Sequence, residues 1–174
     1  MTEQKFDKDT WRTPEYFFKW LDMRFNFDID GCANEHNALC QNWIGEGSPL
    51  SEDFLDTKRP YPYRKLRFYV NPPYSEVTPF LKAAKELRDK GHTVVMLLNN
   101  DKSTQWYQNH IHNVANEVID ITGGRIAFIH PVTGKEIKGN NKGQMVIVFD
   151  PSMQDFVMRS VSLDFVKKCG GYGV

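Results

Sequence analysis

The sequence has little that would hold a metal ion or a set of disulfides. Its 174 residues include three cysteines, Cys32, Cys40 and Cys169. They are too few and too scattered for a zinc site or a disulfide framework, so we expect no metal. The net charge is zero, so a nucleic-acid partner would have to be held by a local basic patch. No apolar run approaches a membrane span, and the polar opening MTEQKFDKDT lacks a signal core, which together predict a cytoplasmic protein.

The chain is large enough to bury a core of its own. Hydrophobic residues make up 40% and aromatic residues 13% of it, as in folded globular proteins. No internal repeat, low-complexity tract or long linker divides it. We therefore expect a single domain over residues 1–174, with the core in about 11–150 and a C-terminal tail in 151–174.

Apolar periodicity predicts alternating helices and strands. Helices are expected over 13–25, 34–42, 77–90, 103–112 and, with a weaker pattern, 152–168. Strands are expected over 25–33, 66–70, 93–99, 117–122, 125–130 and 144–149. The strand at 93–99, TVVMLLN, is nearly all apolar, which is typical of a strand covered on both faces. The order predicts a three-layer α/β domain whose mostly parallel sheet has an antiparallel edge.

The clearest chemical signal is the end of the strand at 66–70, where the chain reads NPPY. The Asn71 side-chain carbonyl and the Pro72 backbone carbonyl are hydrogen-bond acceptors, and the rings of Pro72 and Pro73 fix the backbone. Two rigid acceptors suit the two hydrogens of a planar amine, and Tyr74 offers a ring on which a π-rich group can stack. A strand that ends in a proline turn before a helix has the same pattern without any function.

Further segments recur with NPPY in a known order. The chain contains WRTP (11–14), FDIDGCANEHNALC (27–40), NPPYS (71–75), VVMLLNNDKSTQWY (94–107) and GGRIAF (123–128). NPPY resembles the catalytic motif of amino-group methyltransferases that use S-adenosylmethionine. The full series resembles the small phage and prophage DNA adenine methyltransferases of the Dam type, over about residues 11–150. The resemblance implies a Rossmann-like class I methyltransferase fold.

The resemblance also implies roles for individual residues. Asn71 and Pro72, with Pro73, would hold the adenine amine, and Tyr74 would stack on the base after it flips out of the duplex. The implied cofactor contacts lie on the first strand, on an acidic-aromatic pair and on the N-terminal segment: Asp28, Asp30, Gly31, Asp53, Phe54, Trp11, Thr13 and Pro14. Asp28 and Asp30 lie on the same face of a strand, so either is a candidate. Trp11 also fits an aromatic lid on the core, and the pair at 53–54 also fits an ordinary loop.

Basic residues near these motifs are candidates for contact with DNA. The run 57–67, TKRPYPYRKLR, carries five basic residues and no acid just before the catalytic strand, and it includes Arg64 and Lys65. Its tyrosines and cations suit phosphate contacts, although a basic run is also typical of a solvated face. Further candidates lie in later loops: Lys102, Ser103, Arg125 and Lys138.

The sequence therefore predicts transfer of a methyl group from S-adenosylmethionine to the N6 amine of adenine in DNA. One alternative is methylation of another planar amine, in an RNA base or a protein glutamine. Another is a catalytically silent nucleic-acid-binding module with the same fold. A separate target-recognition domain has no room in the chain, so we expect any sequence specificity to come from loops such as 45–65 and 131–143.

Overall fold

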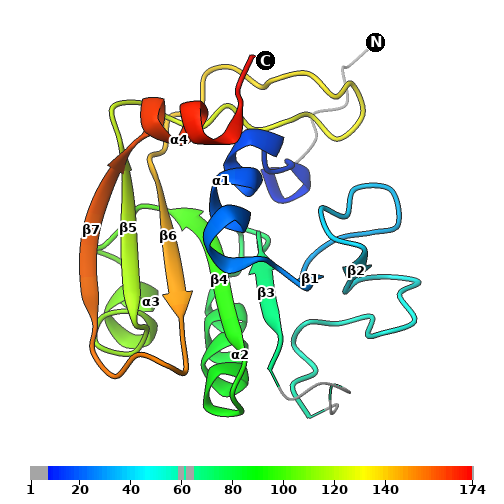
Figure 1. Cartoon of the computed structure of the whole chain (residues 1–174), viewed down its shortest axis with the longest axis vertical. Helices are drawn as coiled ribbons and strands as arrows, with labels where there is room; N and C mark the ends of the chain where they lie inside the picture. The colour runs from blue at the N-terminus through cyan, green and yellow to red at the C-terminus, as the bar shows by residue number, and fades with distance from the viewer. Residues whose placement is uncertain (1–7, 59–60, 62–64, 174) are drawn as a thin grey trace.

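One mixed sheet forms the centre of the molecule (Figure 1). The computed structural model describes residues 8–58, 61 and 65–173. Among these residues, seven strands pair in the order β2-β1-β3-β4-β6-β5-β7. Their bounds are β1 Ile29–Asp30, β2 Asn42–Trp43, β3 Arg67–Val70, β4 Thr93–Asn99, β5 Glu117–Thr122, β6 Gln144–Phe149 and β7 Val157–Ser162.

The strand directions confirm a mostly parallel sheet with one antiparallel element. The pairs β1–β2, β1–β3, β3–β4 and β5–β7 are parallel, whereas β6 is antiparallel to both β4 and β5. The antiparallel strand therefore lies inside the sheet. The sequence had indicated an antiparallel strand at the edge. The reason is the tail, which supplies the strand β7 beside β5 in place of the uninterrupted helix expected over 152–168.

Helices cover both faces of the sheet and make the three expected layers (Figure 1). On one face, α1 (Glu15–Phe25) and α4 (Leu163–Gly170) share a core cluster with one side of the central strands. On the other, α2 (Thr78–Asp89) and α3 (Gln105–His110) share a second cluster with the opposite side. A short 3₁₀ helix, Lys8–Thr10, precedes α1.

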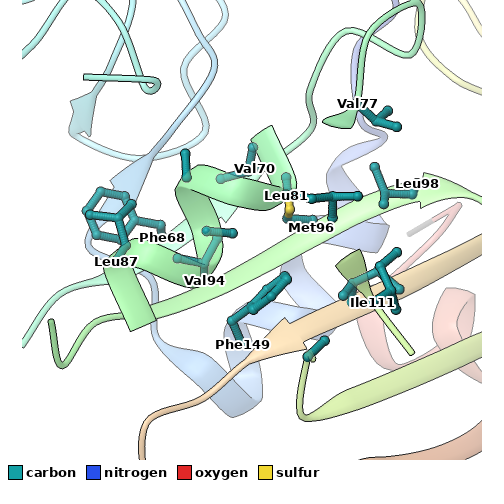
Figure 2. Packing of buried hydrophobic residues seen from close by; sticks show 14 of the residues in the cluster. Phe68, Val70, Val77, Leu81, Leu87, Val94, Met96, Leu98, Ile111 and Phe149 are labelled. Carbon is teal, nitrogen blue, oxygen red and sulfur yellow. The ribbon is translucent and has the colours of Figure 1, made fainter. Parts of the chain in front are cut away.

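Side-chain alternation along β4 explains how one strand serves both cores. Val94, Met96 and Leu98 face α2, as Figure 2 shows, whereas Val95 and Leu97 face α1. All five side chains are fully buried. Each such side chain contributes roughly 1.5–3 kcal/mol on burial, which is why the continuous apolar run identified a central strand.

Several expected boundaries are wrong, each for a local reason. No helix forms over 34–42: the Asn34 side chain accepts hydrogen bonds from the backbone N–H groups of His36 and Asn37, so Asx turns replace helical bonds. The strand expected over 25–33 is reduced to β1, because Phe25 ends α1. The segment 125–130 pairs only at Ile129, through isolated bridges to Arg12 and Glu136.

Candidate active site

A cavity of about 1040 Å³ lies at the carboxyl edge of β1 and β3. The sheet places it there, since β2 and β3 pair on opposite sides of β1, and ligands bind where the strand order reverses in this way. Its walls come from the N-terminal segment, from β1 and the turns after it, from the end of β3, and from the segment after Phe128. These contribute residues 9–13, Asp30, 32–34, 36–39, Tyr69, Asn71, Ile129, Pro131 and Gly134, and α1 closes one side.

Asn71 follows the last residue of β3 and reaches this cavity. Its side-chain nitrogen donates to the Trp11 backbone carbonyl at 3.4 Å. Its side-chain oxygen Oδ1 is buried and has no hydrogen-bond partner among the described residues. Because buried carbonyl oxygens are nearly always paired, this oxygen is an acceptor ready for a donor on a ligand.

Tyr74 is half-buried and belongs to an aromatic group around the NPPY turn. Its ring contacts Phe128 edge-on, with centroids 6.2 Å apart, and Phe128 in turn lies 6.1 Å from the Trp11 ring. The Tyr74 hydroxyl is buried without a partner among the described residues, and burial raises its pKa. The phenol is therefore neutral, and its ring packs against Phe128.

Asp30, at the end of β1, is a buried carboxylate in the cavity lining. It is 3% exposed and accepts hydrogen bonds from the backbone N–H groups of Cys32 at 3.3 Å and Leu39 at 3.1 Å. Burial outweighs these two bonds and raises its pKa from 3.8 to about 6. A buried carboxylate facing a cavity is suited to hydroxyl or ammonium groups of a ligand.

Asp28, the competing candidate, lies outside this cavity lining. Its carboxylate accepts a hydrogen bond from the backbone N–H of Arg67 at 2.9 Å and pairs with the Arg67 guanidinium at 3.3 Å. Arg67 begins β3, whereas Asn71 follows its end. The structure thus separates the two carboxylates that the sequence left open, and only Asp30 lies at the ligand edge.

Gly31 is required by close packing behind the site. A Cβ atom there would lie 2.8 Å from Val70 Cγ2 and 3.2 Å from Phe54 Cδ2. Phe54 is 2% exposed, and its ring stacks on that of Phe80, with centroids 5.9 Å apart. Its observed contacts are therefore those of a core residue. Asp53 is exposed and caps the turn at Leu55.

The N-terminal segment runs beside the cavity. Trp11 and Thr13 line it, and the buried Thr13 hydroxyl hydrogen-bonds to the Tyr69 hydroxyl at 2.5 Å. Pro14 is buried and takes the N-cap position of α1 without a side-chain cap. The Thr13 hydroxyl is thus bonded to β3 and does not cap this helix.

The loop candidates for DNA contact lie at the same edge of the sheet as Asn71. They are Lys102, Ser103, Arg125 and Lys138. Lys102 pairs with Asp120 at 2.6 Å and donates to Asn100 at 2.7 Å, so its charge is largely compensated. Arg125 and Lys138 are exposed in the long connection between β5 and β6. The Ser103 hydroxyl donates to Asp101.

Lys65, from the basic run, lies at the edge of the sheet opposite to Asn71. Lys65 precedes Arg67, the first residue of β3, and lines a different cavity, with Arg24 and Asp150. In Figure 1 β3 begins at its lower end, away from the loops beyond β4 and β5. Lys65 and Asn71 are close in sequence, but β3 runs across the sheet between them. Arg64 lies outside the described residues.

Two residues of the site were missed from the sequence. Asp9 accepts hydrogen bonds from the backbone N–H and the hydroxyl of Ser75, directly after NPPY. No local sequence pattern predicts a contact between positions 66 residues apart. Phe128, which contacts both Tyr74 and Trp11, lies within the GGRIAF segment that was recognised, but its aromatic ring was not singled out.

Neither a metal centre nor a membrane span is found in the part of the chain that the structure describes. Across residues 8–58, 61 and 65–173, no group of three or more His, Cys, Asp or Glu side chains is placed to hold an ion. Over the same residues, no helix is long and apolar enough to cross a bilayer.

The fold and the site together define a class of protein. It is that of the amino-group methyltransferases. Their features are a Rossmann-like sheet, a buried carboxylate at the end of β1, and an NPPY turn with an unpaired acceptor beside one cavity. The sequence profile described as DNA N-6-adenine-methyltransferase (Dam) matches residues 1–171. The chain belongs to this family.

Two phage proteins named DNA N-6-adenine-methyltransferase are similar to the chain. The one from Haemophilus phage HP1 (strain HP1c1) is 39% identical over 173 residues, covering 96% of this chain and 94% of the phage protein. The one from Escherichia phage T1 is 33% identical over 156 residues, covering 81% of this chain and 62% of the phage protein. The similarity thus extends well beyond the NPPY motif.

Proposed function

We propose that this DNA N-6-adenine methyltransferase takes its methyl group from S-adenosylmethionine and holds the target adenine at Asn71, Pro72 and Tyr74. The observation that carries the proposal is the buried, unpaired Oδ1 of Asn71. One hydrogen of the adenine amine is donated to this oxygen and the other to the Pro72 backbone carbonyl. Tyr74 supplies the face on which the flipped base stacks.

The two acceptors also favour the reaction. Hydrogen bonds from the amine to Asn71 and Pro72 increase the electron density on the nitrogen and its tetrahedral character. When bound, S-adenosylmethionine supplies an electrophilic methyl group on a sulfonium centre. Asn71 and Pro72 would hold the amine nitrogen toward this methyl group, and the methylated amine would then release its proton to solvent. Proximity within a closed site supplies most of the acceleration.

The cavity beside Asn71 fits the donor by its chemistry. Asp30 offers a carboxylate for hydroxyl or ammonium groups, and Trp11 and Thr13 form the facing wall. Cys32 also lines the cavity, and burial, together with the nearby charges of Asp30 and Asp53, raises the pKa of its thiol. A neutral thiol is a poor nucleophile, which agrees with a direct transfer to the base.

We place the DNA over the carboxyl edge of the sheet, on the side of the loops after β4 and β5. Lys138 and Arg125 are the exposed cations proposed to contact phosphates, with Ser103 beside them. Lys102 would act by holding Asp120 and Asn100 in place. The proposal treats residues 1–174 as one methyltransferase domain of phage origin, working in the cytoplasm of the host cell.

Pools of DNA, RNA and protein incubated separately with methyl-labelled S-adenosylmethionine test this function. Label is expected in DNA alone, as N6-methyladenine after digestion to nucleosides. Label in RNA or in protein would establish a different amine as the substrate. Absence of label from all three pools, while the protein still binds DNA, would support a silent binding module and refute the proposal.

A further inference from the structure

Alternate residues of the N-terminal segment 9–13 hold successive parts of the catalytic stretch 69–75. We call this segment the N-terminal strap. Thr13 bonds to Tyr69, the Trp11 carbonyl to Asn71, and Asp9 to Ser75. The strap thus runs in the direction opposite to β3 and its turn. Its last residue contacts β3, and its first contacts the residue after NPPY.

The strap is itself anchored from its other side. Arg12, between two of these contacts, pairs with Ile129 through two backbone hydrogen bonds of 2.9 Å. Its guanidinium also donates to the Pro131 carbonyl at 2.8 Å. Asp9 belongs to the 3₁₀ helix Lys8–Thr10, and Arg12 forms the bridge to Ile129. One short segment thus contacts both the NPPY turn and the segment after Phe128.

Asp9 makes the strap's contact with the far end of the turn. Its carboxylate accepts two hydrogen bonds from Ser75, from the backbone N–H at 3.0 Å and from the hydroxyl. Pro72 and Pro73 lack backbone N–H groups, which limits how the turn can be fixed from within. A charged acceptor that grips one residue twice is a strong and directional hold.

The Trp11 carbonyl determines which way the Asn71 amide faces. A carbonyl oxygen only accepts hydrogen bonds, so the group that approaches it at 3.4 Å must be the amide nitrogen of Asn71. The amide oxygen is therefore directed away from the strap, where it is buried and unpaired among the described residues. The orientation needed to accept a hydrogen from an amine is thus set by the N-terminal strap.

We propose that Asp9 is a positioning residue for methyl transfer, which holds the NPPY turn through Ser75 so that Asn71 and Tyr74 meet the adenine in the reactive geometry. This inference rests on the proposed function of those two residues. Asp9 acts through the turn and does not touch the reacting atoms. Its loss should therefore slow the chemical step more than it weakens binding of the methyl donor.

The test compares Asp9→Ala, Ser75→Ala and the double variant in steady-state methylation of DNA and in calorimetric binding of S-adenosylmethionine. We expect kcat to fall about 10- to 100-fold in each single variant, the range that small misplacements of reacting groups produce. The double variant should be no slower than Asp9→Ala, because Ser75→Ala removes one of the two hydrogen bonds that Asp9→Ala removes. The dissociation constant for the methyl donor should stay within about threefold of wild type, since catalysis and uniform binding respond separately.

Two further variants separate positioning from general damage. Ser75→Thr keeps the hydroxyl that Ser75→Ala lacks, so it should restore most of the activity lost in Ser75→Ala. Asp164→Asn removes an exposed carboxylate from the first turn of α4 and should leave kcat unchanged. Urea unfolding of all variants shows whether they fold.

If Asp9→Ala folds and keeps the wild-type kcat while Asn71→Ala is inactive, the inference is overturned and the proposed function is left intact. Multiplicative losses in the double variant, or weaker donor binding with unchanged kcat, would also overturn it. If the wild-type protein itself fails to methylate DNA, the proposed function fails first.

Discussion

Replacing Asp30 with asparagine should change how the stability of the protein depends on pH. The folded protein keeps the Asp30 proton up to a pKa of about 6, because the carboxyl is buried, whereas the unfolded chain loses it near 3.8. Between these values the folded state binds more protons than the unfolded state. Stability from this group is therefore greatest below about pH 4 and is lost as pH rises to about 6.

The magnitude follows from the two pKa values. The difference between 3.8 and about 6 corresponds to about 3 kcal/mol of unfolding free energy at 1.36 kcal/mol per pH unit. Integrated over the range that is convenient to measure, about 1.3 kcal/mol of it is lost between pH 5 and pH 7. Asp30→Asn has no carboxyl at this position, so it lacks this pH-dependent contribution to stability. It also loses one of the hydrogen bonds from Cys32 and Leu39, but that cost is the same at both pH values.

Urea unfolding of wild type and Asp30→Asn at pH 5 and pH 7 isolates the effect. The stability of wild type relative to the variant should fall by about 1.3 kcal/mol between the two pH values. A difference that does not change with pH, or that grows as pH rises, would refute the reasoning. In parallel, Asp30→Asn should weaken binding of S-adenosylmethionine, whereas Asp28→Asn, the matched control outside the cavity, should not.

Three further changes test other parts of the site. Gly31→Ala should lower the unfolding free energy by about 1–3 kcal/mol, because its Cβ would lie 2.8 Å from Val70 Cγ2; an unchanged urea midpoint would contradict this. Tyr74→Phe removes a buried hydroxyl without a partner among the described residues, so stability should be unchanged or higher by about 1 kcal/mol and kcat should be retained. A large fall in kcat would mean that the hydroxyl takes part in the reaction. Lys138→Ala should weaken DNA binding and reduce the slope of log K against log salt by about 1; an unchanged slope would remove this residue from the proposed phosphate contacts.

The sequence predicted those parts of the site that depend on local order. Asn71 lies at the end of a strand because an apolar run stops at two prolines, and both features are visible in the sequence. Only the structure distinguishes the surroundings of Asp28 and Asp30, since these depend on where β1 ends and on the pairing of Asp28 with Arg67.

Contacts between distant segments could not be predicted in the same way. The bond from Asp9 to Ser75 joins residues 66 positions apart, and no periodicity in either segment encodes it. Lys65 shows the converse: it is close to Asn71 in sequence, but β3 runs between them and carries them to opposite edges of the sheet. Strand direction, which the sequence gives only indirectly, decides this second case.

The most direct test of the central claim, that the Asn71 carbonyl holds the amine that is methylated, compares wild type with Asn71→Ala on one DNA substrate. The measurement is N6-methyladenine by mass spectrometry of digested DNA, together with calorimetric binding of S-adenosylmethionine. The account predicts N6-methyladenine with wild type, none with the variant, and donor affinities within about threefold of each other, since only the transition-state contact is lost. Wild-type levels of N6-methyladenine from a variant that lacks the Asn71 carbonyl would contradict it.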